Sequence, residues 1–193
     1  MPEVSEPAAR GTRGSRRTLL LIALVAIAPV VASTLVYVFF PRPAAVNYGT
    51  LLPIGAAPDT NGTALDGAPF QLSALRGKWL LVIASGGACD DRCRGALYAT
   101  RQARTIQGRE QDRMVRVWLI TDAATPPADV LRVDPALIAV RVDGAVIARW
   151  PAGAGAIYVV DPHGNVVLQY PVDPDIKRLA KDLKRLLSAS SIG

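Results

Sequence analysis

The sequence WLLVIASGGACDDRCRGAL at residues 79–97 predicts a buried strand, a glycine-containing loop and the start of a helix. Residues 79–84 are continuously apolar, as expected of a central strand that is covered on both faces. The two aspartates that follow Cys89 can cap a helix that continues to about residue 107. Cys89 and Cys93 therefore lie where the strand passes into the helix.

Further short strands and helices are predicted on both sides of this unit. They are a hairpin at 60–72, a second buried strand at 115–121, a short helix or turn near residue 131, apolar segments at 138–142 and 146–150 joined by a D-G turn, a hairpin at 156–170 and a final helix at 174–187. A strand–helix–strand unit beside an antiparallel hairpin and a closing helix is the plan of a thioredoxin-like α/β domain.

An apolar segment precedes this α/β domain. Residues 18–40 contain no charge and, as a helix, span about 34 Å, enough to cross a bilayer. Four arginines precede the segment, so the positive-inside rule places the N-terminus in the cytoplasm. A cleaved signal peptide is the alternative, but its apolar region is normally shorter. We therefore expect a single-pass membrane protein whose C-terminal domain is exported.

The predicted organisation has four parts: a basic tail at 1–17, a transmembrane helix at 18–40, a linker at 41–58 and an exported domain at 59–193. Residues 41–58 are rich in proline and alanine, with little periodicity.

Composition excludes several classes of protein. The chain has 193 residues, a net charge of +6, two cysteines and one histidine. Two cysteines are too few for a disulfide-rich scaffold, and a four-ligand zinc site would need carboxylate help. One histidine leaves little scope for a Ser-His-Asp triad. Seven arginines lie between Arg92 and Arg116, but acidic residues interleave with them. We expect a solvated helix face or a docking surface for an acidic partner there, and no nucleic-acid binding.

The cysteine spacing, CxxxC, places both sulfur atoms on one helix face. There they can form a disulfide or share one soft metal ion, and Cu(I) is better suited than zinc to two thiolates. An inert disulfide is the alternative, although closing so short a loop contributes only about 2 kcal/mol, against about 4.7 for a 100-residue loop. If Cys89 and Cys93 react with a client or a metal ion, their sulfur atoms should be accessible. His163, in a predicted turn, and Met114, in a predicted strand, are weaker candidates for a third ligand.

Three motifs resemble the Sco/SenC family of cytochrome oxidase assembly factors. They are residues 75–79 (LRGKW) leading into a buried strand, the pair Cys89 and Cys93, and residues 157–162 (IYVVDP) followed by Gly164-Asn165. Residues 47–49 and 98–113 are similar to a proteobacterial transmembrane protein of oxidase assembly gene neighbourhoods. The resemblance implies a membrane-anchored thioredoxin fold in which Cys89 and Cys93 are copper ligands or a redox dithiol.

One Sco/SenC feature has no counterpart in this sequence. The resemblance places a copper-binding histidine a few residues before the strand at 157–161, where this chain has Gly-Ala-Gly-Ala at 153–156. Copper binding is therefore expected to be two-coordinate, completed by a partner, or absent.

We thus expect an assembly factor rather than a turnover enzyme, held in the inner (plasma) membrane by a single helix with its C-terminal domain in the periplasm. It would handle Cu(I) or keep a client's thiols reduced through Cys89 and Cys93. Its partner would be a cytochrome c oxidase subunit or another assembly factor. A periplasmic thiol-disulfide oxidoreductase is the enzymatic alternative, with Cys89 as the attacking residue. A docking module with an inert disulfide is the third hypothesis.

Overall fold

The computed structural model describes residues 13–39 and 47–192, which form two separate compact units. The first unit is helix α1, Arg13–Phe39. Its segment Arg16–Val36 is long and apolar enough to cross a membrane, with a mean hydropathy of 2.7, and none of it is buried. Pro29 lies within the helix, as the sequence allows for a membrane span. Residue 40 of the predicted span lies outside the described residues.

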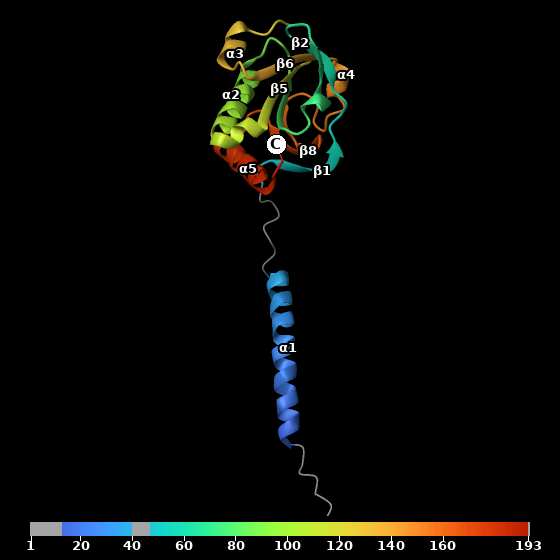
Figure 1. Cartoon of the computed structure of the whole chain (residues 1–193), viewed down its shortest axis with the longest axis vertical. Coiled ribbons are helices and arrows are strands. Elements are labelled where there is room, and N and C mark those ends of the chain that lie inside the picture. The colour runs from blue at the N-terminus through green and yellow to red at the C-terminus, as the bar shows by residue number, and fades with distance from the viewer. Residues whose placement is uncertain (1–12, 40–46, 193) are drawn as a thin grey trace, which may run out of the picture. The chain divides into compact units, whose positions relative to one another are not determined.

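The second unit contains one eight-stranded mixed sheet (Figure 1). The spatial order of its strands is β1-β8-β7-β4-β5-β6-β2-β3. The strands are β1 Thr50–Ala56, β2 Asn61–Ala64, β3 Pro69–Gln71, β4 Trp79–Ser85, β5 Met114–Ile120, β6 Leu137–Val142, β7 Ala156–Val160 and β8 Asn165–Pro171. Strands β4, β5 and β6 run parallel, and the other pairings are antiparallel. The predicted buried strands are thus the two central ones, and both predicted hairpins form.

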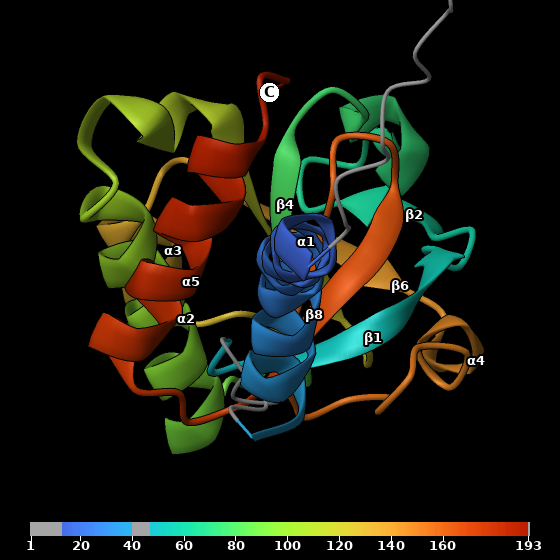
Figure 2. The same cartoon turned by 90° about the horizontal axis from the view of Figure 1, so that it is seen from below.

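The helical elements lie between these strands and after the last one. They are the 3-10 helices η1 Leu72–Leu75 and η2 Gly108–Arg113, and the α-helices α2 Asp91–Thr105, α3 Ala128–Val133, α4 Gly144–Ile147 and α5 Ile176–Ala189. Helices α2 and α5 lie together beside the sheet, and α4 lies away from them (Figure 2).

The central strands alternate between two cores, as a two-faced sheet requires. Leu81 and Ile83 of β4 pack into a cluster that includes residues of α2 and α5, such as Leu183. Leu80 and Val82 face the opposite cluster, which contains residues of η1 and the α4 region. Both faces are covered, which explains the uninterrupted apolar sequence of β4.

Two parts of the structure differ from the sequence predictions. Residues Thr50–Ala56, assigned to the linker, form strand β1, which pairs antiparallel with β8. Residues 41–46 of that linker lie outside the described residues. Of the two apolar segments joined by the D-G turn, only the first is a strand. The second begins as helix α4, because the carboxylate of Asp143 accepts a hydrogen bond from the backbone N–H of Ala145 (2.9 Å) and caps it.

Candidate thiol site

The cysteine pair lies at the end of β4 and the start of α2, as predicted. Cys89 belongs to the intervening loop, and Cys93 lies in the first turn of the helix. The carboxylate of Asp90 caps α2 by accepting a hydrogen bond from the backbone N–H of Cys93 (2.9 Å). One of the helix N–H groups that could stabilise a thiolate is therefore already bonded to a carboxylate.

Cys89 and Cys93 are joined by a disulfide, with their Cα atoms 5.0 Å apart. This separation lies within the usual range for disulfides. Cys89 adopts a φ of 48°, and it is the only residue other than glycine with a positive φ in the described part of the chain. Non-glycine residues seldom adopt this left-handed conformation, so the backbone at Cys89 carries strain.

The sulfur atoms are not accessible in this disulfide form, so the expectation of exposed sulfurs was wrong. Cys89 is 3% exposed and Cys93 1% exposed. Both belong to the core cluster that also contains Leu97 and Trp118. A disulfide is nonpolar, and the apolar faces of α2 and β5 cover it. A client or metal ion can reach these atoms only after the loop moves.

The loop before Cys89 is held by the segment that follows β5. The carboxylate of Asp122 accepts hydrogen bonds from the backbone N–H groups of Gly87 (2.8 Å) and Ala124 (3.0 Å). A Cβ at Gly87 would come within 2.2 Å of the Ala124 carbonyl oxygen, so only glycine fits. Sequence reasoning missed these contacts. The adjacent glycines at 86 and 87 were the available signal, since glycine permits close backbone approach.

Arg94, which follows Cys93, is paired with a carboxylate. The Arg94 guanidinium donates a hydrogen bond to the Asp129 carboxylate of α3 (2.7 Å). This bond raises the pKa of Arg94 and lowers that of Asp129. The Asp129 carboxylate thus offsets the positive charge with which Arg94 could stabilise a thiolate.

Residues 153–156, near which the Sco/SenC resemblance places a histidine, lie beside the end of β4, where the loop that contains Cys89 begins. The backbone N–H of Gly155 donates to the carbonyl oxygen of Ala84 (3.3 Å), at the end of β4. The segment's glycines and alanines supply no ligand side chain. Among the described residues, no group of three or more His, Cys, Asp or Glu side chains is arranged to hold a metal ion.

The two weaker third-ligand candidates lie at the other end of the sheet. Val160 of β7 pairs with Leu80 at the start of β4, and His163 follows in the turn beyond Val160. Met114 pairs with Trp79, also at the start of β4, and is buried. Neither residue is brought to the cysteine pair.

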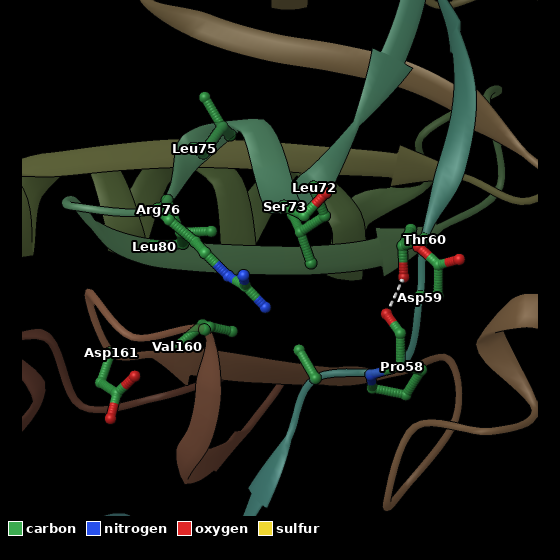
Figure 3. Close-up of a pocket in the computed structure, with 12 residues that line it drawn as sticks. Pro58, Asp59, Thr60, Leu72, Ser73, Leu75, Arg76, Leu80, Val160 and Asp161 are labelled. Carbon is green, nitrogen blue, oxygen red and sulfur yellow. Dashed lines mark hydrogen bonds between the residues drawn. The ribbon is translucent and has the colours of Figure 1, made fainter.

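A cavity of about 200 Å³ occurs near that same end of the sheet. Arg76 points into it, and Leu80, Val160 and Asp161 are among its lining residues (Figure 3). The Asp161 carboxylate is used within its own turn, where it accepts backbone hydrogen bonds from His163 (2.9 Å) and Asn165 (2.8 Å). Neither cysteine lines the cavity, so the cavity is separate from the cysteine pair.

Sequence comparison identifies the family. The profile of the family described as transmembrane-like, thioredoxin-like, C-terminal domain matches residues 79–190, more than half of the chain. The chain belongs to this family. The transmembrane-like thioredoxin-like match includes β4, both cysteines and α5. Together with helix α1, it indicates a single-pass membrane protein. No curated protein matches the sequence.

Solved structures similar to this family member are thioredoxin-like. Apo Sco1 from Thermus thermophilus has a TM-score of 0.61 and 20% identity, covering 75% of this chain and 99% of its own. ScoI from Bradyrhizobium japonicum with copper bound has a TM-score of 0.55 and 21% identity, covering 68% and 99%. The thioredoxin domain of a Bacteroides vulgatus thiol-disulfide oxidoreductase has a TM-score of 0.52 and 18% identity, covering 72% and 99%. The predicted thioredoxin-like fold and Sco-like resemblance are confirmed.

Proposed function

We propose that this protein is a membrane-anchored thioredoxin-like factor whose cysteine pair reduces a client's disulfide during cytochrome c oxidase assembly. The observation that carries the proposal is the Cys89–Cys93 disulfide at the junction of β4 and α2. Both cysteines are already paired and are held by a short loop with a strained Cys89 backbone. This arrangement suits a pair that alternates between disulfide and dithiol.

The exchange requires the reduced form of the pair. The Cys89 thiolate attacks one sulfur of the client disulfide, forms a mixed disulfide and releases the other client sulfur as a thiolate. Cys93, as a thiolate, then attacks the Cys89 sulfur and releases the second client thiolate. Two electrons pass to the client, and the Cys89–Cys93 disulfide remains. A separate dithiol donor must reduce it for another cycle.

Cys89 is the better candidate for the attacking residue. It belongs to the loop, whereas Cys93 lies within the first turn of α2 with its backbone N–H bonded to Asp90. Opening of residues 86–89 would expose Cys89 without unwinding the helix. The membrane helix supports this function because confinement beside a membrane client raises the effective concentration.

Trapping of the mixed disulfide tests the proposal. The full-length chain in detergent is reduced, freed of reductant and mixed with a peptide that contains one disulfide. Wild type should reduce about one disulfide per chain, and Cys93→Ser should stop at a mixed disulfide with Cys89. Cys89→Ser is the matched control and should form little adduct. Absence of exchange by the reduced wild type, together with unchanged oxidase activity in a Cys93→Ser strain, would favour an inert disulfide in a docking module.

Transfer of Cu(I) is the second candidate function. Two sulfur atoms held together at the start of α2 suit a soft ion that accepts two thiolates, and a similar fold has been solved with copper bound. No third ligand is available among the described residues, so a partner would complete the coordination. Anaerobic titration of the reduced chain should then give one Cu(I) per chain, and Cys89→Ser should abolish it. Copper uptake unchanged in this variant would contradict the role of the pair.

We also propose that the domain faces the periplasm from the inner membrane. The arginines before residue 18 support this orientation through the positive-inside rule. Protease added to intact spheroplasts should remove the thioredoxin-like domain, whereas cleavage only after lysis would place the domain in the cytoplasm.

A further inference from the structure

Helix α5 carries a basic outer face. Its exposed basic residues recur at helical spacing and are Lys177, Arg178, Lys181, Lys184 and Arg185. These five residues are here called the α5 basic face. The only acidic residue of the helix, Asp182, is 2% exposed and points inward. Three of the four lysines in the whole chain lie on this face.

The domain's N-terminal residues lie directly against the same helix. The Asp182 carboxylate accepts hydrogen bonds from the backbone N–H groups of Tyr48 (2.7 Å) and Gly49 (2.9 Å). The Tyr48 hydroxyl accepts a hydrogen bond from the backbone N–H of Asp175 (3.0 Å), and the Arg178 guanidinium stacks 4.3 Å from the centre of the Tyr48 ring. The chain therefore enters the domain beside the α5 basic face.

The connection to the membrane helix is short. Helix α1 ends at Phe39, and eight residue steps lead from it to Asn47, the first residue of the compact domain. Covalent geometry limits such a stretch to about 28 Å. The residue at which the domain begins is thus joined to the end of α1 by a connection that can be no longer than this.

We propose that the α5 basic face binds the anionic phospholipid headgroups of the membrane that α1 crosses. Opposite charge favours this partner, because clustered Lys and Arg side chains near a membrane are attracted to anionic headgroups. Within the helix, the buried Asp182 carboxylate pairs with one member of the face, Arg185 (3.5 Å). The other carboxylates near the face lie at the ends of α5. Asp173 and Asp175 precede the helix, and Glu110 lies beside its last turn, where it pairs with Arg113. Between these ends, the exposed charged side chains of the helix are all basic.

This binding would orient the domain as well as attract it. The cysteine pair lies at the start of α2, which packs against α5 in the same layer. Fixing α5 on the headgroups restricts the directions in which the Cys89 loop can be presented to a membrane client. The inference does not depend on the chemistry of the cysteines.

Amine labelling of the full-length chain in lipid nanodiscs tests the proposal. Discs of phosphatidylcholine alone are compared with discs that also contain phosphatidylglycerol, and labelling of each lysine is followed by mass spectrometry. Lys177, Lys181 and Lys184 should react several-fold more slowly in the anionic discs, and high salt should remove the difference. Lys78 serves as the internal reference. It directly precedes β4, and its ammonium group donates a hydrogen bond to the Asp112 carbonyl oxygen.

A charge-removing variant separates attraction from simple proximity. In Lys177→Gln/Lys181→Gln, the remaining Lys184 should lose most of its protection in anionic discs. The matched control Arg132→Gln/Arg149→Gln removes two exposed charges from α3 and the turn after α4, and should leave the protection unchanged. Equal labelling in the two kinds of disc would overturn the proposal and leave the α5 basic face to an acidic protein partner.

Discussion

The Asp122 carboxylate accepts a hydrogen bond from the backbone N–H of Gly87 at 2.8 Å. This contact links the loop between β4 and α2, which contains Cys89, to the segment after β5. The same oxygen accepts a bond from Ala124. Asp122 thus restrains the loop that must move before the buried sulfur atoms can react. Its contacts are to backbone groups, so it acts as a positioning residue rather than a catalytic one.

Asp122→Ala should make the disulfide easier to reduce. A hydrogen bond of this kind contributes about 1 kcal/mol, which corresponds to about a fivefold change in the population of an open loop. The rate of reduction by a small phosphine, followed by trapping of free thiols, should rise by about that factor. Asp112→Ala, at an exposed carboxylate in η2, is the control and should react like wild type. A rate unchanged in Asp122→Ala would show that another contact limits opening.

Gly87→Ala should destabilise the oxidised protein by at least about 2 kcal/mol, because its Cβ would overlap the Ala124 carbonyl oxygen. Chemical denaturation of the full-length chain in detergent, monitored by tryptophan fluorescence, measures the loss. Gly95→Ala is the matched control. No atom lies within 4 Å of a Cβ at Gly95, which is within α2, and alanine there should stabilise the helix by about 0.5–1 kcal/mol. Equal effects of the two variants would contradict the close approach at Gly87.

Asp90→Asn should raise the reduction potential of the pair by about 10–30 mV. Asparagine caps helices as well as aspartate does, so the bond to the Cys93 N–H is retained. Loss of the negative charge favours thiolate and thereby stabilises the reduced form. Equilibration with glutathione buffers measures the potential. Asp91→Asn is the comparison variant. The Asp91 carboxylate does not bond the Cys93 N–H, so its replacement should shift the potential less. A fall in the potential of Asp90→Asn would refute the electrostatic argument.

Tyr170 should make the stability depend on pH in alkaline solution. Burial, and then the nearby Asp182 carboxylate, to which the Tyr170 hydroxyl donates a hydrogen bond (3.2 Å), raise the pKa of Tyr170. The unfolded chain loses this proton near pH 10 while the folded chain keeps it, so the contribution is present below pH 10 and is lost as the pH rises.

Tyr170→Phe should therefore be less stable than wild type by about 1 kcal/mol at pH 7. The difference should shrink between pH 10 and 11.5, as measured by urea denaturation at each pH. Tyr98→Phe, at an exposed tyrosine, should keep the wild-type profile. A constant difference between Tyr170→Phe and wild type across this range would argue against the buried tyrosine–carboxylate contact.

Much of the domain was predictable from local sequence patterns. The apolar run of β4, the capping aspartate of α2 and the D-P-H-G-N turn between β7 and β8 each specify their own structure. The position of the cysteine pair followed from these elements, because the end of a strand and the start of a helix are both readable in sequence.

The missed features depend on contacts between distant residues. Strand β1 contains Pro53 and Gly55 and reads as a linker, but β8 offers an edge with which it pairs. The burial of the cysteines depends on α2 and β5 closing over the disulfide. Asp122 lies 35 residues from Gly87, and its role arises from the parallel pairing of β4 with β5, which brings their ends together.

The two outermost strands of the sheet each contain a proline. Pro53 lies in β1, whose pairing with β8 also has an irregular register, and Pro69 begins the three-residue strand β3. Proline has no N–H to donate to an added strand, and short or bulged margins discourage strand addition. Edge-to-edge pairing between copies of the domain held in one membrane is thereby disfavoured.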